Sequence, residues 1–164
     1  MANGSLRPTV RIAGHAIHPI VIPVPIVCFV AVLLTDILYW GTARMMWADF
    51  SAWFVTIGLI FGVIAAIIGL IDFFGDRDIR DLPQARFHMT ANVVVLILAL
   101  LNTLVHSRDA WTSVVPGGLI LSTLVVVILA FSGWMGWSMV RNQGIVTDTR
   151  ARERERATMT GARP

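Results

Sequence analysis

Hydrophobic residues run along the chain in four long stretches separated by short polar segments. The stretches cover residues 20–40, 51–74, 88–106 and 115–138. Each holds about the 20 apolar residues that an α-helix needs to cross a bilayer. The pattern predicts an all-α integral membrane protein, with a four-helix bundle in residues 20–140. We expect residues 1–19 to form a cytoplasmic N-terminal segment and residues 141–164 to form a charged, partly disordered cytoplasmic tail.

Proline and capping residues indicate where the helices begin. Proline is tolerated only in the first helical turn, so a regular first helix is expected to start near Pro23, after an irregular segment at 15–19. Pro83 lies near the expected first position of the third helix. The second helix is expected to start after Asp49, a suitable N-cap, with Ser51 as the competing cap.

The third stretch carries a polar and small stripe along its whole length. At 100° per residue, five side chains lie within about 40° of one direction: His88, Asn92, Ala99, Asn102 and His106. Eighteen residues rise about 27 Å in a helix, which places the two histidines near opposite membrane surfaces. We expect this stripe to face the interior of the bundle.

Small residues form one face on each of two other helices. The second helix carries Gly58, Gly62, Ala65 and Gly69, and the fourth carries Gly118, Ser122, Ser132 and Gly136. Small side chains let the backbones of neighbouring membrane helices approach closely. These faces are therefore expected to pack against other helices.

Composition and charge agree with a membrane protein. Hydrophobic residues make up 56% of the 164 residues and charged residues only 14%, whereas soluble domains carry about 25% charged residues. All 13 basic residues are arginine, and only Arg44 and Arg108 lie on the side opposite to the termini. Because basic residues near span ends stay in the cytoplasm, both termini are expected there. Because membrane topology explains why the chain carries these basic residues, the net charge of +3 does not indicate a nucleic-acid partner, and we expect none.

Histidines and an aspartate converge at the cytoplasmic end of the expected bundle. They are His15, His18, Asp72 and His88. Two imidazoles facing each other across a bundle suit the axial positions of a b-type haem, and Asp72 would orient one of them. The same four residues also suit a divalent transition metal. In the third interpretation no cofactor binds, and the residues terminate helices or bond loop amides.

A second polar group is expected near the outer surface. Asp36 lies one turn from the end of the first helix, at a depth similar to that of His106, and Asn102 lies one turn before that histidine. An ionisable residue within a span is costly and is a functional candidate. Asp36 is interpreted either as structural, bonded to Tyr39, His106 or Arg44, or as part of a proton or ion path. Asn102 is interpreted first as an interhelical hydrogen-bonding residue.

Three functions follow from these patterns. The first is haem or metal binding with one-electron transfer at the cytoplasmic side. The second is a cofactor-free scaffold or assembly subunit that binds other membrane subunits or a second copy through its small-residue faces. The third is a small oligomeric transporter or proton path along the polar stripe. The chain contains no Gly-x-Ser-x-Gly, His-Glu-x-x-His or phosphate-loop motif, so we do not expect a hydrolase.

Four motifs in order resemble a family of bacterial four-helix proteins that are described only as predicted membrane proteins of unknown function. The motifs are Gly14-His15-Ala16-Ile17-His18-Pro19, Gly69-Leu70-Ile71-Asp72, Ala85-Arg86-Phe87-His88 and Gly133-Trp134-Met135-Gly136-Trp137. The family ends the last motif with a Gly-Gly pair, where this chain has Gly136-Trp137. The resemblance implies a multi-pass protein of a bacterial inner membrane and places His18, Asp72 and His88 in the family pattern. It implies no activity.

Overall fold

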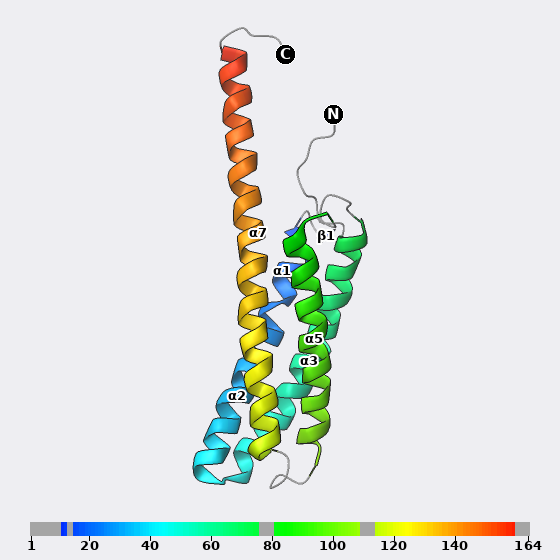
Figure 1. Ribbon diagram of the computed structural model, residues 1–164, viewed down its shortest axis with the longest axis vertical. Helices are drawn as coiled ribbons and strands as arrows, with labels where there is room; N and C mark the ends of the chain where they lie inside the picture. Colours follow the sequence, from blue (N-terminus) through cyan, green and yellow to red (C-terminus); the bar gives the residue numbers. More distant parts are fainter. Residues whose placement is uncertain (1–10, 13–14, 76–80, 109–113, 160–164) are drawn as a thin grey trace.

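Helices make up most of the part of the chain that the computed structural model describes, which is residues 11–12, 15–75, 81–108 and 114–159. The long helices are α2 (Pro23–Thr42), α3 (Met45–Gly75), α5 (Pro83–His106) and α7 (Leu119–Met159) (Figure 1). The short elements are β1 (Arg11–Ile12), β2 (His15–Ala16), α1 (His18–Val21) and η1 (Val114–Gly118). The two-residue strands pair antiparallel. Four segments are long and apolar enough to cross a membrane, namely His18–Thr42, Met45–Gly75, Pro83–His106 and Val114–Ser138, which confirms the expected four-helix membrane fold.

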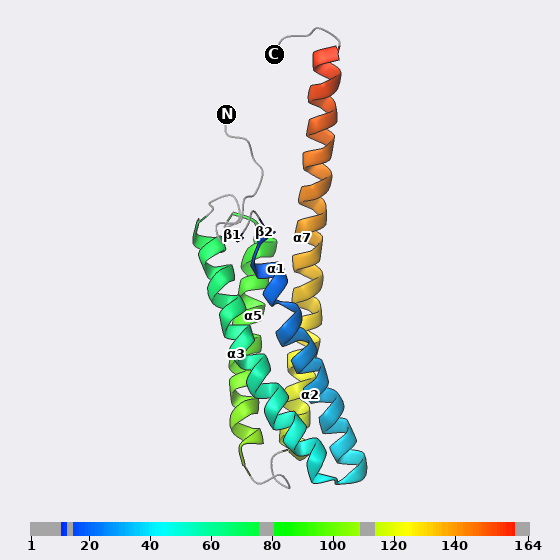
Figure 2. The ribbon, with the colours of Figure 1, turned by 180° about the vertical axis from the view of Figure 1, so that it is seen from behind.

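The helices follow one another round the bundle in sequence order. Helix α2 packs against α3 and α7, and α5 packs against the same two helices, so α2 and α5 lie on a diagonal (Figures 1 and 2). We call the end with α1 and the start of α5 the proximal end, and the end with the α2–α3 turn the distal end. The diagonal arrangement brings residues at the start of the first and third spans towards each other at the proximal end.

Helix starts follow the proline signals but not the capping signal. Helices α2 and α5 begin at Pro23 and Pro83, as expected. Helix α3 begins at Met45, so Asp49 and Ser51 lie inside it and the expected N-cap position is wrong. The reason is the two-residue α2–α3 turn, in which Ala43 adopts a left-handed conformation with φ of 51° and donates its N–H to the Tyr39 carbonyl at 2.7 Å. The expected irregular segment is partly ordered, because β2 and α1 fall within it.

The middle of the bundle is a narrow apolar layer. It consists of Phe29, Val95, Ala99 and Val125, with Leu59, Leu98, Ile128 and Leu129 packed around it. On the small-residue face of α3, a Cβ atom on Gly58 would lie 2.9 Å from Cε1 of Phe29, and one on Gly62 would lie 2.9 Å from Cδ2 of Leu96. This face is therefore occupied by the protein's own helices, as its small residues predict.

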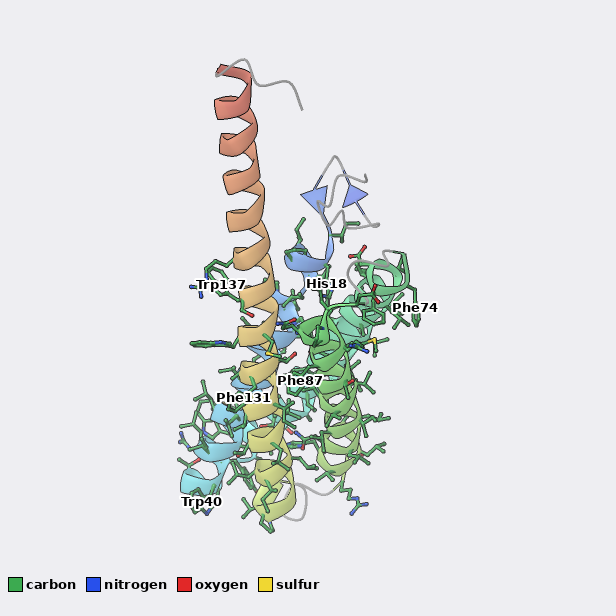
Figure 3. All side chains as sticks on the ribbon, turned by 45° about the horizontal axis from the view of Figure 1, so that its top comes forward. His18, Trp40, Phe74, Phe87, Phe131 and Trp137 are labelled. Atoms are coloured by element: carbon green, nitrogen blue, oxygen red, sulfur yellow. The ribbon has the colours of Figure 1, made fainter. Side chains whose placement is uncertain are left out.

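The outward faces of the four membrane-crossing segments are apolar. Large exposed side chains include Trp40, Phe74, Phe87, Phe131 and Trp137, which Figure 3 shows around the bundle. A surface this apolar is typical of contact with lipid rather than water. The outer surface of the bundle therefore contacts the bilayer.

Helix α7 continues far beyond its membrane-crossing part. The span ends at Ser138 and the helix at Met159, and the figures show this extension standing apart from the other helices. The charged composition favoured a partly disordered tail, whereas the structure has a helix there. Adding residues to an existing helix is much easier than starting a new one, so a stable span can propagate into a charged segment.

Candidate functional site: two histidine clusters

A carboxylate at the distal end is hydrogen-bonded to three other helices. Asp36 of α2 is fully buried. Ser51 Oγ of α3 donates to its Oδ1 at 2.6 Å, and Ser122 Oγ of α7 donates to its Oδ2 at 2.5 Å. His106 Nε2 of α5 lies 3.0 Å from Oδ1. Of the three partners that the sequence offered for Asp36, the structure selects His106.

Further hydrogen bonds extend this distal cluster. Asn102 Nδ2 donates to Ser122 Oγ at 2.9 Å, and His106 Nδ1 lies 3.0 Å from the backbone oxygen of Asn102. Thr35 Oγ1 lies 2.7 Å from Ser51 Oγ. The distal cluster thus joins all four long helices through polar side chains, which is the structural role expected for polar residues inside membrane bundles.

The second cluster lies at the proximal end and is centred on His88. Its Nδ1 lies 2.9 Å from the backbone oxygen of Ser132 and 2.9 Å from the Ser132 hydroxyl. Asn92 Nδ2 donates to Ser132 Oγ and to the backbone oxygen of His88, both at 2.7 Å, and lies 3.2 Å from His88 Nε2. A Cβ atom on Gly136 would lie 3.2 Å from His88 Cε1. The imidazole of His88 therefore packs against one turn of small residues on α7.

The imidazole of His18 packs in a similar way against Gly69 of α3. A Cβ atom on Gly69 would lie 3.0 Å from His18 Cε1, and the imidazole is hydrogen-bonded to the backbone of Ala65. The Nδ1 atom of His18 is buried and has no hydrogen-bond partner, so the hydrogen bond to Ala65 is made by Nε2. Each proximal imidazole thus packs against a glycine and forms a hydrogen bond to a backbone oxygen through one ring nitrogen.

The proximal residues expected to act together lie near one another. Both His88 and Asp72 interact electrostatically with His18. The ring hydrogen bonds described for the histidines go to Ala65, Ser132 and Asn92, and the orientation of one imidazole by Asp72 stays a prediction. For His15 the structure describes only the backbone, in β2. Among the described residues, no group of three or more His, Cys, Asp or Glu side chains is close enough to hold a metal ion.

The polar stripe of α5 faces the bundle interior but is divided in two. Asn92 belongs to the proximal cluster and Asn102 to the distal cluster. Between them, Val95 and Ala99 belong to the apolar layer with Phe29 and Val125. A layer of this kind separates the two clusters, so within one protomer they are distinct sites.

Comparison with known families identifies the chain. A family model described as "Predicted membrane protein (DUF2231)" matches residues 14–149, which include all four spans and both clusters. The chain belongs to the DUF2231 family. This membership confirms the resemblance to a family of predicted membrane proteins of unknown function, whereas the four motifs themselves stay a prediction. The DUF2231 description names a membrane protein without naming an activity. Comparison with curated proteins found no match. Comparison with solved structures found none either.

Several residues of this DUF2231 protein had been assigned simpler roles from the sequence. Ser51 was expected to compete as a helix cap, whereas it donates to Asp36. Ser122, Ser132 and Gly136 were assigned to close packing, whereas they contact Asp36, Asn92 and His88. The signal was present, because two serines on one helix stripe opposite two asparagines on another suggest interhelical hydrogen bonds.

Proposed function

We propose that this protein is a membrane-anchored haem b protein in which His18 and His88 would hold the haem iron, and that bound haem would supply one-electron transfer near the proximal face. The observation that supports this best is the buried Nδ1 atom of His18, which has no hydrogen-bond partner. Leaving a buried polar atom unsatisfied costs about 1–3 kcal/mol. Such exceptions are rare in folded proteins, and a ligand-binding role is one physical reason for retaining them.

The surroundings of His88 leave it with one nitrogen for a ligand. Asn92 Nδ2 donates its two hydrogens in the two 2.7 Å hydrogen bonds. Its third contact, at 3.2 Å from His88 Nε2, therefore leaves the lone pair of that nitrogen free to bind a ligand. Nδ1 donates to the Ser132 backbone oxygen at 2.9 Å, which fixes the tautomer. Metal-ligating histidines are usually held in this way, with the second nitrogen donating to a carbonyl or carboxylate.

The number of ligands favours haem over a single metal ion. Two imidazoles complete the coordination of a haem iron, whereas a divalent metal in a protein site usually takes three or four protein ligands. The described residues offer no group of three. Helix α1, which carries His18, has no residue that is buried as a whole, so the proposed site lies at the edge of the bundle, where a large group is accommodated more easily than in the core. Bound haem would supply the exchange of single electrons.

The other residues of the site would position and neutralise the group. Ser132 and Asn92 hold His88, while Gly69 and Gly136 leave room for the two rings. Arg86 is exposed two residues before His88, and guanidinium groups pair well with carboxylates such as propionates.

The same proposal includes the location. The resemblance of the four motifs supports a bacterial inner membrane, and the arginine distribution supports an orientation with the proximal end and both termini in the cytoplasm. The scaffold alternative is disfavoured because the small-residue faces of α3 and α7 contact the protein's own side chains, including Phe29, Leu96 and His88.

The first test is an ultraviolet-visible spectrum of the protein purified in mild detergent from haem-replete cells, oxidised and then reduced with dithionite. We expect a Soret band and split visible bands on reduction, both lost in His18→Ala and in His88→Ala. Gly133→Ala is the matched control, because no atom lies within 4 Å of the added Cβ and the residue is next to Ser132. Size-exclusion profiles check that each variant is folded.

Elemental analysis of the same samples separates the alternatives. A featureless spectrum with one transition-metal ion per chain, lost in both histidine variants, would replace haem by a single ion. A featureless spectrum without stoichiometric metal would overturn cofactor binding and leave the proximal histidines a structural role.

A further inference from the structure

The Asp36–His106 pair at the distal end lies outside the proposed haem site and has chemistry of its own. We propose that Asp36 and His106 form a proton-binding dyad, and that the hydrogen bonds of the structure correspond to its proton-loaded state. The proposal rests on counting hydrogens at the two residues and does not depend on the proximal site.

The contacts of His106 require one proton more than a neutral imidazole beside a carboxylate supplies. Both ring nitrogens face acceptors, since Nε2 lies 3.0 Å from Asp36 Oδ1 and Nδ1 lies 3.0 Å from the Asn102 backbone oxygen. A neutral imidazole has one N–H and can donate to only one of them. Both contacts are hydrogen bonds either if His106 is an imidazolium, or if Asp36 is protonated and donates to Nε2. In each case the pair holds the same extra proton.

Donors to Asp36 favour the imidazolium form. Ser51 Oγ donates to Oδ1, and Ser122 Oγ donates to Oδ2 while it accepts from Asn102 Nδ2. An ionised carboxylate only accepts hydrogen bonds, so each oxygen of Asp36 accepts from one of these two hydroxyl groups. The resulting pair of opposite charges is neutral as a whole, which lowers the cost of holding it inside a membrane bundle.

The position of the dyad gives its proton a short route to the distal face. His106 is the last residue of α5, and the next two residues, Ser107 and Arg108, are exposed. Towards the proximal end the apolar layer around Phe29 and Val95 closes the bundle. The Oδ1 atom of Asn102, one turn from His106, is buried without a hydrogen-bond partner. It could accept a hydrogen bond from a water molecule that enters from the distal side.

Few other ionisable groups lie at this end among the described residues. They are Tyr39 on α2, Arg44 in the α2–α3 turn, Asp49 on α3 and Arg108 after α5. Tyr39 is buried with Ala48 and Val114, and the three charged residues are exposed. The described part of α7 at this end contributes Ser122 and apolar residues. Among the described residues, the buried ionisable side chains in hydrogen-bond contact at this end are therefore Asp36 and His106.

Loss of the proton would weaken the distal end of the bundle. With one hydrogen removed, either the Asp36 contact or the Asn102 contact of His106 joins two acceptors that repel. Because Asp36 connects α2 with three other helices, the effect reaches all four spans. The dyad would thus couple proton binding on the distal side to the packing of the bundle.

The deciding experiment combines ¹⁵N nuclear magnetic resonance of histidine-labelled protein in nanodiscs at neutral pH with infrared spectroscopy of the carboxyl groups. We expect His106, assigned by its loss in His106→Gln, to show two protonated ring nitrogens. A singly protonated imidazole with a protonated carboxyl band that disappears in Asp36→Asn would also support the dyad. A neutral His106 beside an ionised Asp36 would overturn the proposal.

A pH profile of thermal unfolding separates proton binding from a merely structural contact. Without the proton one of the two contacts of His106 joins two acceptors, so the unfolding temperature of the native protein should fall once the pH is high enough to remove it. Asp36→Asn should flatten this dependence. Thr123→Ala is the matched control, because it removes an exposed hydroxyl from the residue next to Ser122 and leaves the contacts of Asp36 in place, so it should keep the native pH dependence. The same pH dependence in Asp36→Asn as in the native protein would overturn the proposal.

Discussion

At the scale of single residues, each histidine is specified by the small side chains around it. His88 lies against Ser132 and Gly136, and His18 lies against Gly69. In water such contacts compete with solvent, but inside a bilayer a polar side chain has few partners other than those of the bundle. Hydroxyl and glycine positions therefore decide where an imidazole can lie and which nitrogen it leaves free.

One prediction concerns the bond between Asn92 and Ser132, whose Nδ2 and Oγ atoms are 2.7 Å apart. In a double-mutant cycle of Asn92→Ala and Ser132→Ala, we expect a coupling of about 0.6 kcal/mol and at most about 1.7 kcal/mol, the range measured for interhelical hydrogen bonds in membranes. The measurement is the free energy of unfolding in mixed micelles.

The control for that cycle pairs Asn92→Ala with Thr123→Ala. Thr123 is exposed on α7 and donates to the Leu119 backbone at 2.8 Å, so it shares no partner with Asn92. Additive effects are expected for this pair. A coupling as large as that of the first pair would show that the cycle does not report the hydrogen bond.

At the scale of elements, glycines set the separation of α2 and α3. A methyl group on Gly58 would lie 2.9 Å from Phe29 Cε1 and 3.0 Å from Cys28 Cβ. Phe29 also belongs to the apolar layer. Any shift that makes room for the methyl group must therefore disturb the packing at the centre of the bundle.

We accordingly predict that Gly58→Ala lowers the free energy of unfolding by about 1–3 kcal/mol, the usual cost of overpacking. Gly133→Ala is the matched change on an open helix face, where no atom lies within 4 Å of the new methyl group. It should be neutral or stabilise by up to about 1 kcal/mol, because alanine favours helices over glycine. Equal losses in the two variants would contradict the close approach at Gly58.

Helix α7 gives a second prediction at this scale. Its extension beyond the span stands apart from the other helices in Figures 1 and 2. Removing residues 142–164 should therefore leave the midpoint of thermal unfolding of the bundle unchanged, within the error of a circular-dichroism melt. A drop of several degrees would mean that the extension supports the bundle.

Local signals in the sequence predicted the elements well and the contacts less well. Pro23 and Pro83 mark helix starts because proline fixes its own backbone angle. The polar stripe of α5 was predictable because one helix determines its own faces. The bonds of Ser51 and Ser122 to Asp36 depend on how the helices rotate against one another, which no single stretch of sequence determines. The early start of α3 depends on the left-handed Ala43, a conformation that alanine rarely adopts.

At the scale of the whole molecule, the bundle has two ends of different chemistry. The distal cluster is held by side chains from all four long helices. At the proximal end, His88 is held between α5 and α7, whereas His18 is carried by α1, a helix without buried residues. The apolar layer separates them. Local opening is therefore expected to start at the proximal end, where fewer contacts must break.

Orientation in the membrane is the prediction at this scale. In a Cys28→Ala background, Arg141→Cys in right-side-out vesicles should resist a membrane-impermeant maleimide and Arg108→Cys should react. Both arginines are exposed in the structure and lie near opposite ends of the bundle. The reverse labelling pattern would overturn the assignment of the termini to the cytoplasm.

Helix α7 is continuous and forms a lever arm that extends beyond the membrane-crossing part of the bundle. One continuous helix runs from Ser122, which bonds Asp36, past Ser132 beside His88, to Met159. At 1.5 Å per residue the arm from Ser122 to the tip is about 55 Å long, so a tilt of about 5° would move the tip by about 5 Å. A small rearrangement at the distal hydrogen bonds would thus be amplified into a displacement that a fluorescent label near Met159 can report from the opposite side of the membrane.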